Sequence, residues 1–228
     1  MRKSHAGFTL FLIVLCSILA VGTVYAERTH RSSKKGRKYA VTITNLTRGQ
    51  VITPPVVIVH NEKFRLFVPG EPAIPELAAL AEDGITGPLL GLLPGLPSVL
   101  RGTMAPGPLM PGESVTVEVR AKWNYPLVTV AGMLASSNDA FFAIRGKRVP
   151  VFGKSATYAV AYDAGSEANL ELCDQIPGPP CGNEEVRHTE GAENYVHVHS
   201  GIHGIGDLLP EVFDWRNPVA KVVISPIH

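Results

Sequence analysis

The segment Ser114-Val-Thr-Val-Glu-Val-Arg-Ala121 alternates apolar and polar side chains with a period of two. In a β-strand this alternation sends the three valines to one face and the polar residues between them to the other face. The preceding Pro111-Gly112 is a turn signal. The segment is therefore predicted to be a strand with one buried and one exposed face.

Strand signals recur along most of the chain. β-Branched and aromatic residues concentrate in seven further segments, which are residues 39–46, 56–60, 127–134, 141–144, 157–162, 195–199 and 219–224. Residues 76–83 are predicted to form a short helix, because Pro75 precedes them and Gly84 follows. Residues 85–112, rich in glycine, proline and leucine, are expected to form a long, partly buried connection. About eight strands and one short helix predict an all-β fold, an antiparallel β-sandwich.

The composition agrees with one β-rich domain. Hydrophobic residues make up 45% of the 228 residues and charged residues 18%, which is enough apolar side chain to bury a core. Glycine (22 residues) and proline (19 residues) are abundant, which argues against a helical bundle. No linker interrupts the predicted strands, so residues 39–228 are expected to form one domain. A net charge of +1 argues against general nucleic-acid binding.

Residues 1–26 have the pattern of a secretory signal peptide. A basic start with Arg2 and Lys3 precedes an apolar run over residues 8–21, and Val24-Tyr-Ala26 fits a signal-peptidase site. The run is shorter than the roughly 20 apolar residues of a membrane span, although an uncleaved anchor is the alternative. We therefore expect a secreted or periplasmic protein with no membrane span after cleavage.

Residues 27–38 carry six basic residues and one acid. A segment of this composition is expected to be a flexible, solvated leader. The alternative is a contact with an anionic envelope or polymer surface.

Two cysteines, Cys173 and Cys181, remain after Cys16 leaves with the signal peptide. The segment between them is rich in proline and glycine, so its ends are expected to lie close together. In an oxidising compartment such a pair is expected to form a disulfide. Metal binding by the two thiolates is the weaker alternative, because the spacing is not C-x2-C and no second pair exists.

Short oxygen-bearing side chains follow two predicted strands. Asn138 and Asp139 come after the first strand, and Asp163, Glu167 and Asn169 come after the second. Calcium is bound by six to eight oxygens on permissive loops, so converging loops of this kind are candidate calcium ligands. The alternative is that these side chains cap turns by bonding their own backbone.

Three histidines lie close together in the sequence. His197 and His199 would point to one face of a strand, and His203 could fold back through a glycine. Three imidazoles suit zinc or copper, and such a site could belong to an enzyme. Alternatively, the rings bond the backbone or carboxylates such as Asp207 or Asp214 and fix a loop.

Motifs of the common enzyme classes are missing from the sequence. There is no G-x-S-x-G, P-loop or H-E-x-x-H pattern, and the expected disulfide leaves no free cysteine in the mature chain. The sequence therefore predicts a protein without catalytic activity.

Several segments resemble the spondin domain, in its stand-alone bacterial form, which is similar to the N-terminal domain of F-spondin and mindin. The most specific are Asn138-Asp-Ala-Phe-Phe142 and Asp163-Ala-Gly-Ser-Glu167, and the likeness spans roughly residues 39–225. The other segments that carry it are residues 39–48, 53–56, 75–84, 131–134 and 199–204.

The resemblance implies a C2-like β-sandwich that holds calcium between loops at one end. By position, the calcium ligands would be Asp139, Asp163 and Glu167, the last being aspartate in the animal domains, with Asn138 and Asn169 as weaker candidates. It also implies a secreted calcium-binding interaction or adhesion module with an extracellular or envelope partner that the sequence does not identify. A structural envelope protein without a ligand is a further alternative.

Overall fold

The computed structural model describes residues 35–183 and 187–227. The predicted signal peptide and the first eight residues of the predicted leader lie outside this part of the chain. In chain order the strands are β1 (Arg37–Asn45), β2 (Val56–His60), β3 (Val99–Met104), β4 (Ser114–Ala121), β5 (Leu127–Met133), β6 (Ala140–Arg148), β7 (Ser155–Asp163), β8 (His197–Val198) and β9 (Ala220–Pro226). The helices are α2 (Pro75–Asp83), α3 (Gly87–Leu92) and α4 (Pro210–Phe213), with short 3-10 turns η1 (Leu93–Gly95) and η2 (Cys173–Gln175).

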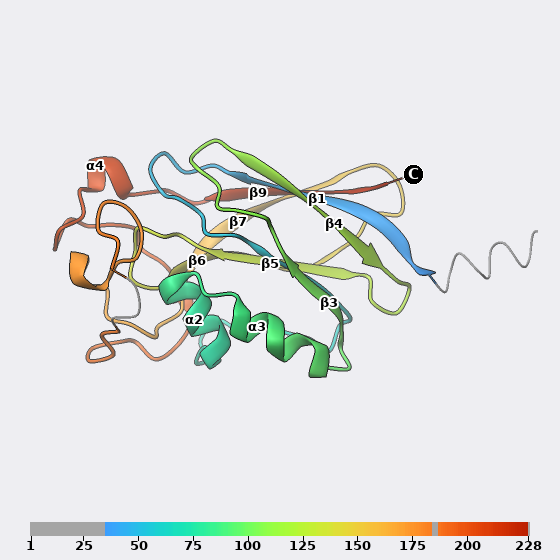
Figure 1. Cartoon of the computed structure of the whole chain (residues 1–228), viewed down its shortest axis with the longest axis horizontal. Coiled ribbons are helices and arrows are strands. Elements are labelled where there is room, and N and C mark those ends of the chain that lie inside the picture. The colour runs from blue at the N-terminus through green and yellow to red at the C-terminus, as the bar shows by residue number, and fades with distance from the viewer. Residues whose placement is uncertain (1–34, 184–186, 228) are drawn as a thin grey trace, which may run out of the picture.

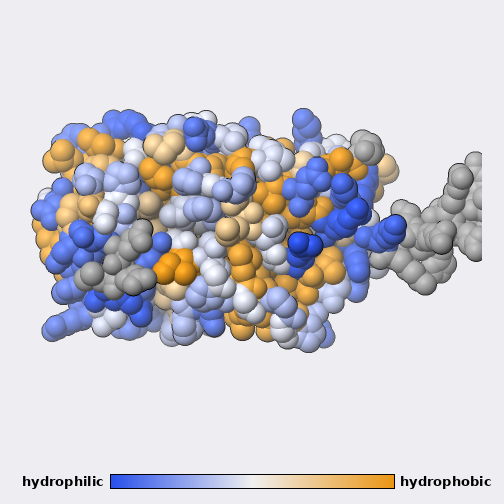
Figure 2. Space-filling model, in the orientation of Figure 1, coloured by the Kyte–Doolittle hydropathy of each residue, from blue (hydrophilic) through white to orange (hydrophobic). Residues whose placement is uncertain are grey.

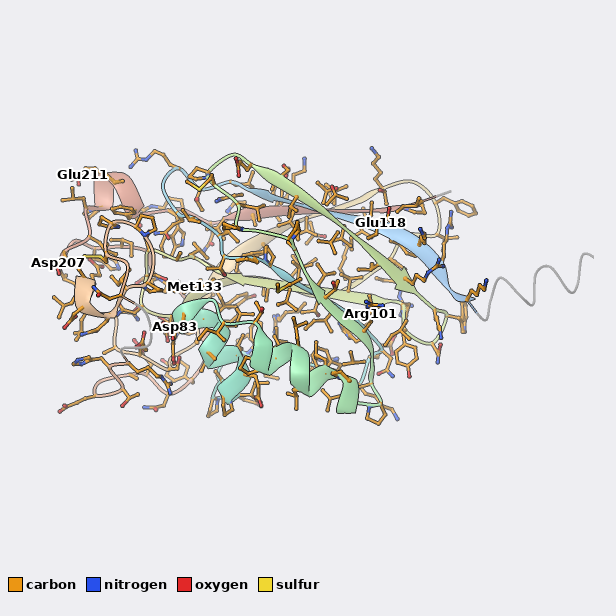
Figure 3. All side chains as sticks on the ribbon, viewed as in Figure 1. Asp83, Arg101, Glu118, Met133, Asp207 and Glu211 are labelled. Atoms are coloured by element: carbon orange, nitrogen blue, oxygen red, sulfur yellow. A yellow bond between two sulfur atoms is a disulfide. The ribbon has the colours of Figure 1, made fainter. Side chains whose placement is uncertain are left out.

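All the strand pairs are antiparallel, which confirms the predicted all-β class (Figure 1). The hydrogen-bonded path runs β3-β2-β5-β6-β7-β9-β1-β4, and β8 is added beside β7. Strand β7 joins two parts of this path, since residues 155–159 pair with β9 and residues 160–163 pair with β6. The path curls so far that the edge strands β3 and β4 line one hollow, with Arg101 facing Glu118 across it (Figure 3).

Two hydrophobic clusters hold the fold together. The first fills the space enclosed by the curled sheet and includes Val41, Val117, Val130 and Phe142, all buried. The second lies between the other face of β2, β5 and β6 and the helices α2 and α3, which cover that face in Figure 1. Burial on both faces explains why β5 is apolar along its length instead of alternating.

The alternating segment that opened the sequence is β4, and its register confirms the prediction. Val117 pairs with Val41 and Val119 pairs with Tyr39, all on the buried face. On the opposite face, the hydroxyl groups of Thr116 and Thr42 are hydrogen-bonded at 2.8 Å.

Helix α2 also matches its prediction. Pro75 occupies the first turn, and Gly84 ends the helix at a φ of 69°, where its N–H bonds the Leu80 carbonyl at 3.1 Å. The prediction for residues 85–112 was wrong, because this segment contains α3, η1 and the edge strand β3. Its leucines are spaced for burial, and Leu89 and Leu93 pack beneath the helices, but the frequent prolines and glycines hide the short elements.

Smaller differences concern boundaries. Strand β1 begins at Arg37, two residues before the predicted start of the domain at residue 39. Of the predicted strand 195–199, only His197–Val198 pairs, and α4 was not predicted.

The predicted disulfide between Cys173 and Cys181 is present, with 4.9 Å between the two Cα atoms. Among the helices of the described residues, none is long and apolar enough to cross a bilayer.

Candidate functional site

The pairing of β6 with β7 brings the first two predicted ligands together. Ala140, the first residue of β6, lies opposite Asp163, the last residue of β7. The N–H of Ala164 also donates to the backbone carbonyl of Asp139 at 3.2 Å. Asp139 and Asp163 are therefore neighbours at the end of the sheet, although 24 residues separate them in the sequence. Their side chains are only 0% and 1% exposed.

The Asp139 carboxylate is half satisfied. Its Oδ2 accepts hydrogen bonds from the backbone N–H groups of Ser166 at 2.8 Å and Glu167 at 3.1 Å, and from the Ser166 hydroxyl at 3.2 Å. Its Oδ1 is buried without any hydrogen-bond partner. A buried carboxylate oxygen without a partner is costly unless a cation or a proton occupies the position beside it.

The Asp163 carboxylate is oriented by its own loop. Its Oδ1 accepts the N–H of Gly165 at 2.7 Å, and its Oδ2 accepts the Asn169 side-chain amide at 2.7 Å. Gly165 has a φ of 65°, and a Cβ at this position would collide with the backbone of Tyr195. The close approach of these two segments therefore requires glycine.

Strand β8 brings two more ligand types to Asp163. His197 lies directly opposite Asp163 in the β7–β8 pair. Ligand atoms of Asp163, Glu193 and His197 all lie within 4.8 Å of one another, the single such group of three His, Cys, Asp or Glu side chains in the described residues. Glu193 Oε2 is also buried without a hydrogen-bond partner.

Glu193 was not among the residues predicted from the sequence. It lies in a segment without periodicity, and only the pairing of β8 with β7 places it beside Asp163. The one available signal was its position four residues before His197.

Glu167 lies on the other side of Asp139. Its backbone N–H bonds Asp139, while its side-chain Oε1 accepts the His188 N–H at 3.1 Å. Burial raises the pKa of Glu167 to about 8, and the negative charges of Glu82 and Asp139 add to this effect. Its carboxylate therefore extends the acidic cluster toward the end of α2.

Electrostatics make the central pair unfavourable when both carboxyls are charged. Burial raises the pKa of Asp139 well above its usual value, and the charge of Asp163 raises it further. Burial likewise raises the pKa of Asp163. Across residues 35–183 and 187–227, no lysine or arginine forms an ion pair with Asp139, Asp163 or Glu167. A cationic ligand would remove this repulsion.

His199 is a structural residue in this arrangement. Its ring is 3% exposed, packs on Trp215 at 5.0 Å between ring centroids, and has a pKa lowered by burial to about 3. Its Nδ1 accepts the Gly201 N–H at 3.0 Å, so its Nε2 carries the proton that bonds Asn169 Oδ1 at 3.2 Å. The neutral ring thereby holds Asn169, which in turn holds Asp163.

The structure does not gather the three predicted histidines around one ion. Both nitrogens of His199 are occupied, and His203 Nε2 is hydrogen-bonded to the Ser200 hydroxyl at 2.8 Å. Of the three, His197 is the one that joins a group of candidate ligands.

The two asparagines differ in role. Asn169 contacts Asp163, whereas Asn138 Oδ1 accepts the N–H of Glu171 at 3.2 Å and its amide nitrogen lies 3.4 Å from Gln175. Asn138 thus ties the loop of Asp139 to a neighbouring segment and does not face Asp163.

Comparison of the chain with models of known protein families and with curated proteins found no match. The functional argument therefore depends on the site itself. Its chemistry is that of a buried acidic cluster centred on Asp139 and Asp163, with Glu167 on one side and Glu193 and His197 on the other.

Proposed function

We propose that this protein is an exported, calcium-binding β-sandwich module that has no catalytic activity and uses the loops around its cation site to bind an extracellular or envelope partner. The observation that carries the proposal is the buried, adjacent pair Asp139 and Asp163, with the partnerless Oδ1 of Asp139. A divalent cation between these carboxylates would satisfy that oxygen and remove the repulsion between them.

The donor atoms favour calcium over softer metals. Carboxylate oxygens come from Asp139 and Asp163, and Glu193 and Glu167 lie on either side of this pair. Hard oxygen ligands on loops suit calcium, which tolerates irregular geometry and keeps water among its ligands. The resemblance to the spondin domain supports the same ion at Asp139, Asp163 and Glu167, and it also supports the finer description of the fold as a C2-like sandwich.

The interaction role follows from the position of the site. A cation there would tie the loop after β7 to the start of β6 and to the segment before β8. Loops held on a rigid sheet are the usual place for recognition surfaces. The unidentified partner would bind this end, with affinity that depends on calcium. The disulfide is compatible with export to a secreted or periplasmic location.

Calcium binding is tested by calorimetric titration and thermal melts of the wild type, Asp163→Asn and Glu211→Gln. Glu211 is an exposed acid on α4 and serves as the matched control (Figure 3). Calcium should raise the Tm of the wild type and of Glu211→Gln, but not that of Asp163→Asn. At a hundredfold excess over Kd the stabilisation should be about 2.7 kcal/mol. An equal calcium response in Asp163→Asn would exclude this site.

Zinc or copper binding is the second candidate, and the group Asp163, Glu193 and His197 favours it. One imidazole and two carboxylates within 4.8 Å of one another resemble the ligand set of a zinc site more than that of a calcium site. The same titrations with zinc and with His197→Ala distinguish the two ions. Zinc binding that His197→Ala abolishes, without calcium binding, would favour this candidate and would require an enzyme assay.

A further inference from the structure

Two large apolar side chains project into solvent from loop tips far from the acidic cluster. Trp123, in the tight turn between β4 and β5, is 96% exposed, and Phe152, in the turn between β6 and β7, is 84% exposed. Val151, beside Phe152, is 64% exposed. Exposed aromatic rings are uncommon on proteins without an interaction surface, and here they gather on two turns instead of being scattered.

The two turns lie at the same end of the fold. The N–H of Val149 donates to the carbonyl of Pro126 at 2.9 Å, which joins the base of one turn to the other. Arg37, at the start of β1, reaches across to the Val151 carbonyl at 2.6 Å. Arg37, Trp123 and Val151 also line one shallow hollow, so the turns form a single surface, here called the aromatic end.

The aromatic end is basic. Between residues 119 and 162 the chain has six lysines and arginines and one acid, Asp139, which belongs to the opposite end. Lys35, Lys38, Arg120 and Lys122 line the hollow between β3 and β4, next to the turn that carries Trp123. Figure 2 shows hydrophilic residues gathered at this end, where the described chain begins.

Acids at this end leave most of the positive charge unbalanced. Glu118 pairs with Lys38 at 3.3 Å and Glu62 pairs with Arg148 at 2.7 Å. No ion pair within residues 35–183 and 187–227 involves Lys35, Arg120 or Lys122. The basic residues of the predicted leader, which runs into β1, add to the charge on this side of the chain.

We propose that the aromatic end docks on an anionic phospholipid bilayer, with Trp123 and Phe152 inserted at the interface and the surrounding lysines and arginines on the lipid phosphates. Aromatic rings favour the headgroup region of a bilayer, and each basic side chain near an anionic surface adds to the attraction. A charged polymer would use the basic residues but would leave both rings in water, so the combination favours lipid. Docking in this way leaves the cation site facing away from the membrane.

Vesicle binding with tryptophan fluorescence tests this proposal. The chain has two tryptophans, and Trp215 is only 6% exposed, so a blue shift on binding reports on Trp123. The processed protein should sediment with phosphatidylglycerol vesicles and show the shift, but not with phosphatidylcholine vesicles. The double variant Trp123→Ser/Phe152→Ser should bind at least about tenfold more weakly.

Two features keep the outcome unambiguous. Leu209→Ser removes an apolar side chain that is 60% exposed at the opposite end, and it should bind like the wild type. All variants share the same residues before Lys35, and the assay is run in EDTA, so neither the leader nor the cation site explains a difference. The proposal is overturned if the double variant binds vesicles as well as the wild type does. It is also overturned if the protein binds an anionic polymer but phosphatidylglycerol vesicles cause no blue shift.

Discussion

At the scale of single residues, the acidic site is built by backbone N–H groups as much as by side chains. Asp139 Oδ2 takes two backbone N–H groups and one hydroxyl from the loop after β7, so this loop is shaped around a negative charge. The other oxygen, Oδ1, has no such support. An aspartate that only capped a turn would have no reason to bury a partnerless oxygen beside a second carboxylate. This asymmetry argues for a ligand over the turn-capping alternative.

Gly165 should be the least replaceable residue of this loop. Gly165→Ala combines a positive φ with a collision against the Tyr195 backbone, and should cost more than about 2 kcal/mol of unfolding free energy. Gly153→Ala is the matched control, because Gly153 has a φ of 66° with nothing within 4 Å of the added Cβ. It should cost about 1 kcal/mol, from the backbone conformation alone. Urea denaturation of both variants measures the difference, and equal costs would contradict the assigned contact.

At the scale of elements, sequence patterns predicted what local rules control. Alternation identified β4, and Pro75 and Gly84 bounded α2. The same reasoning placed Asp139 and Asp163 at strand ends, but not beside each other, because that depends on the register of β6 with β7. Glu193 was missed for the same reason, since β8 is two residues long and is defined only by its pairing with β7.

Helix α2 is tied to the site by one ion pair. Glu82 is buried near Glu167, and both nitrogens of the Arg187 guanidinium approach it, at 2.5 Å and 2.6 Å. Arg187→Ala would leave the Glu82 carboxylate buried without its cation. Because Arg187 is itself half exposed, we expect a loss of about 2 kcal/mol, less than for a fully buried pair.

Arg148→Ala is the control for this prediction. It breaks the pair with Glu62, in which both side chains are mostly exposed, and should cost less than about 1 kcal/mol. Chemical denaturation of the two variants measures both values. A loss for Arg187→Ala as small as that for Arg148→Ala would show that α2 is not anchored by this pair.

At the scale of the whole molecule, the two ends of the sheet differ in charge and in burial. The acidic end, with Asp139, Asp163 and Glu193, buries its charged groups and depends on a cation for their neutralisation. The opposite end exposes its cations and two aromatic rings. Attachment through the aromatic end and recognition through the acidic end would therefore be independent, since about the length of the sheet separates them (Figure 1).

The stability of the cation-free protein should fall as pH rises. Burial raises the pKa of Glu167 from 4.5 to about 8 and raises those of Asp139 and Asp163, so between these limits the folded state binds more protons than the unfolded state. Stability is then greatest below the unfolded pKa and is lost as pH rises through the folded pKa. In EDTA the Tm should drop by several degrees from about pH 5 to about pH 8. Saturating calcium should flatten this slope, because the cation replaces the protons, and Asp163→Asn should flatten it without calcium. An EDTA melt that is more stable at the higher pH would show that the cluster is not strained by its own charge, and would remove the main reason for placing a cation there.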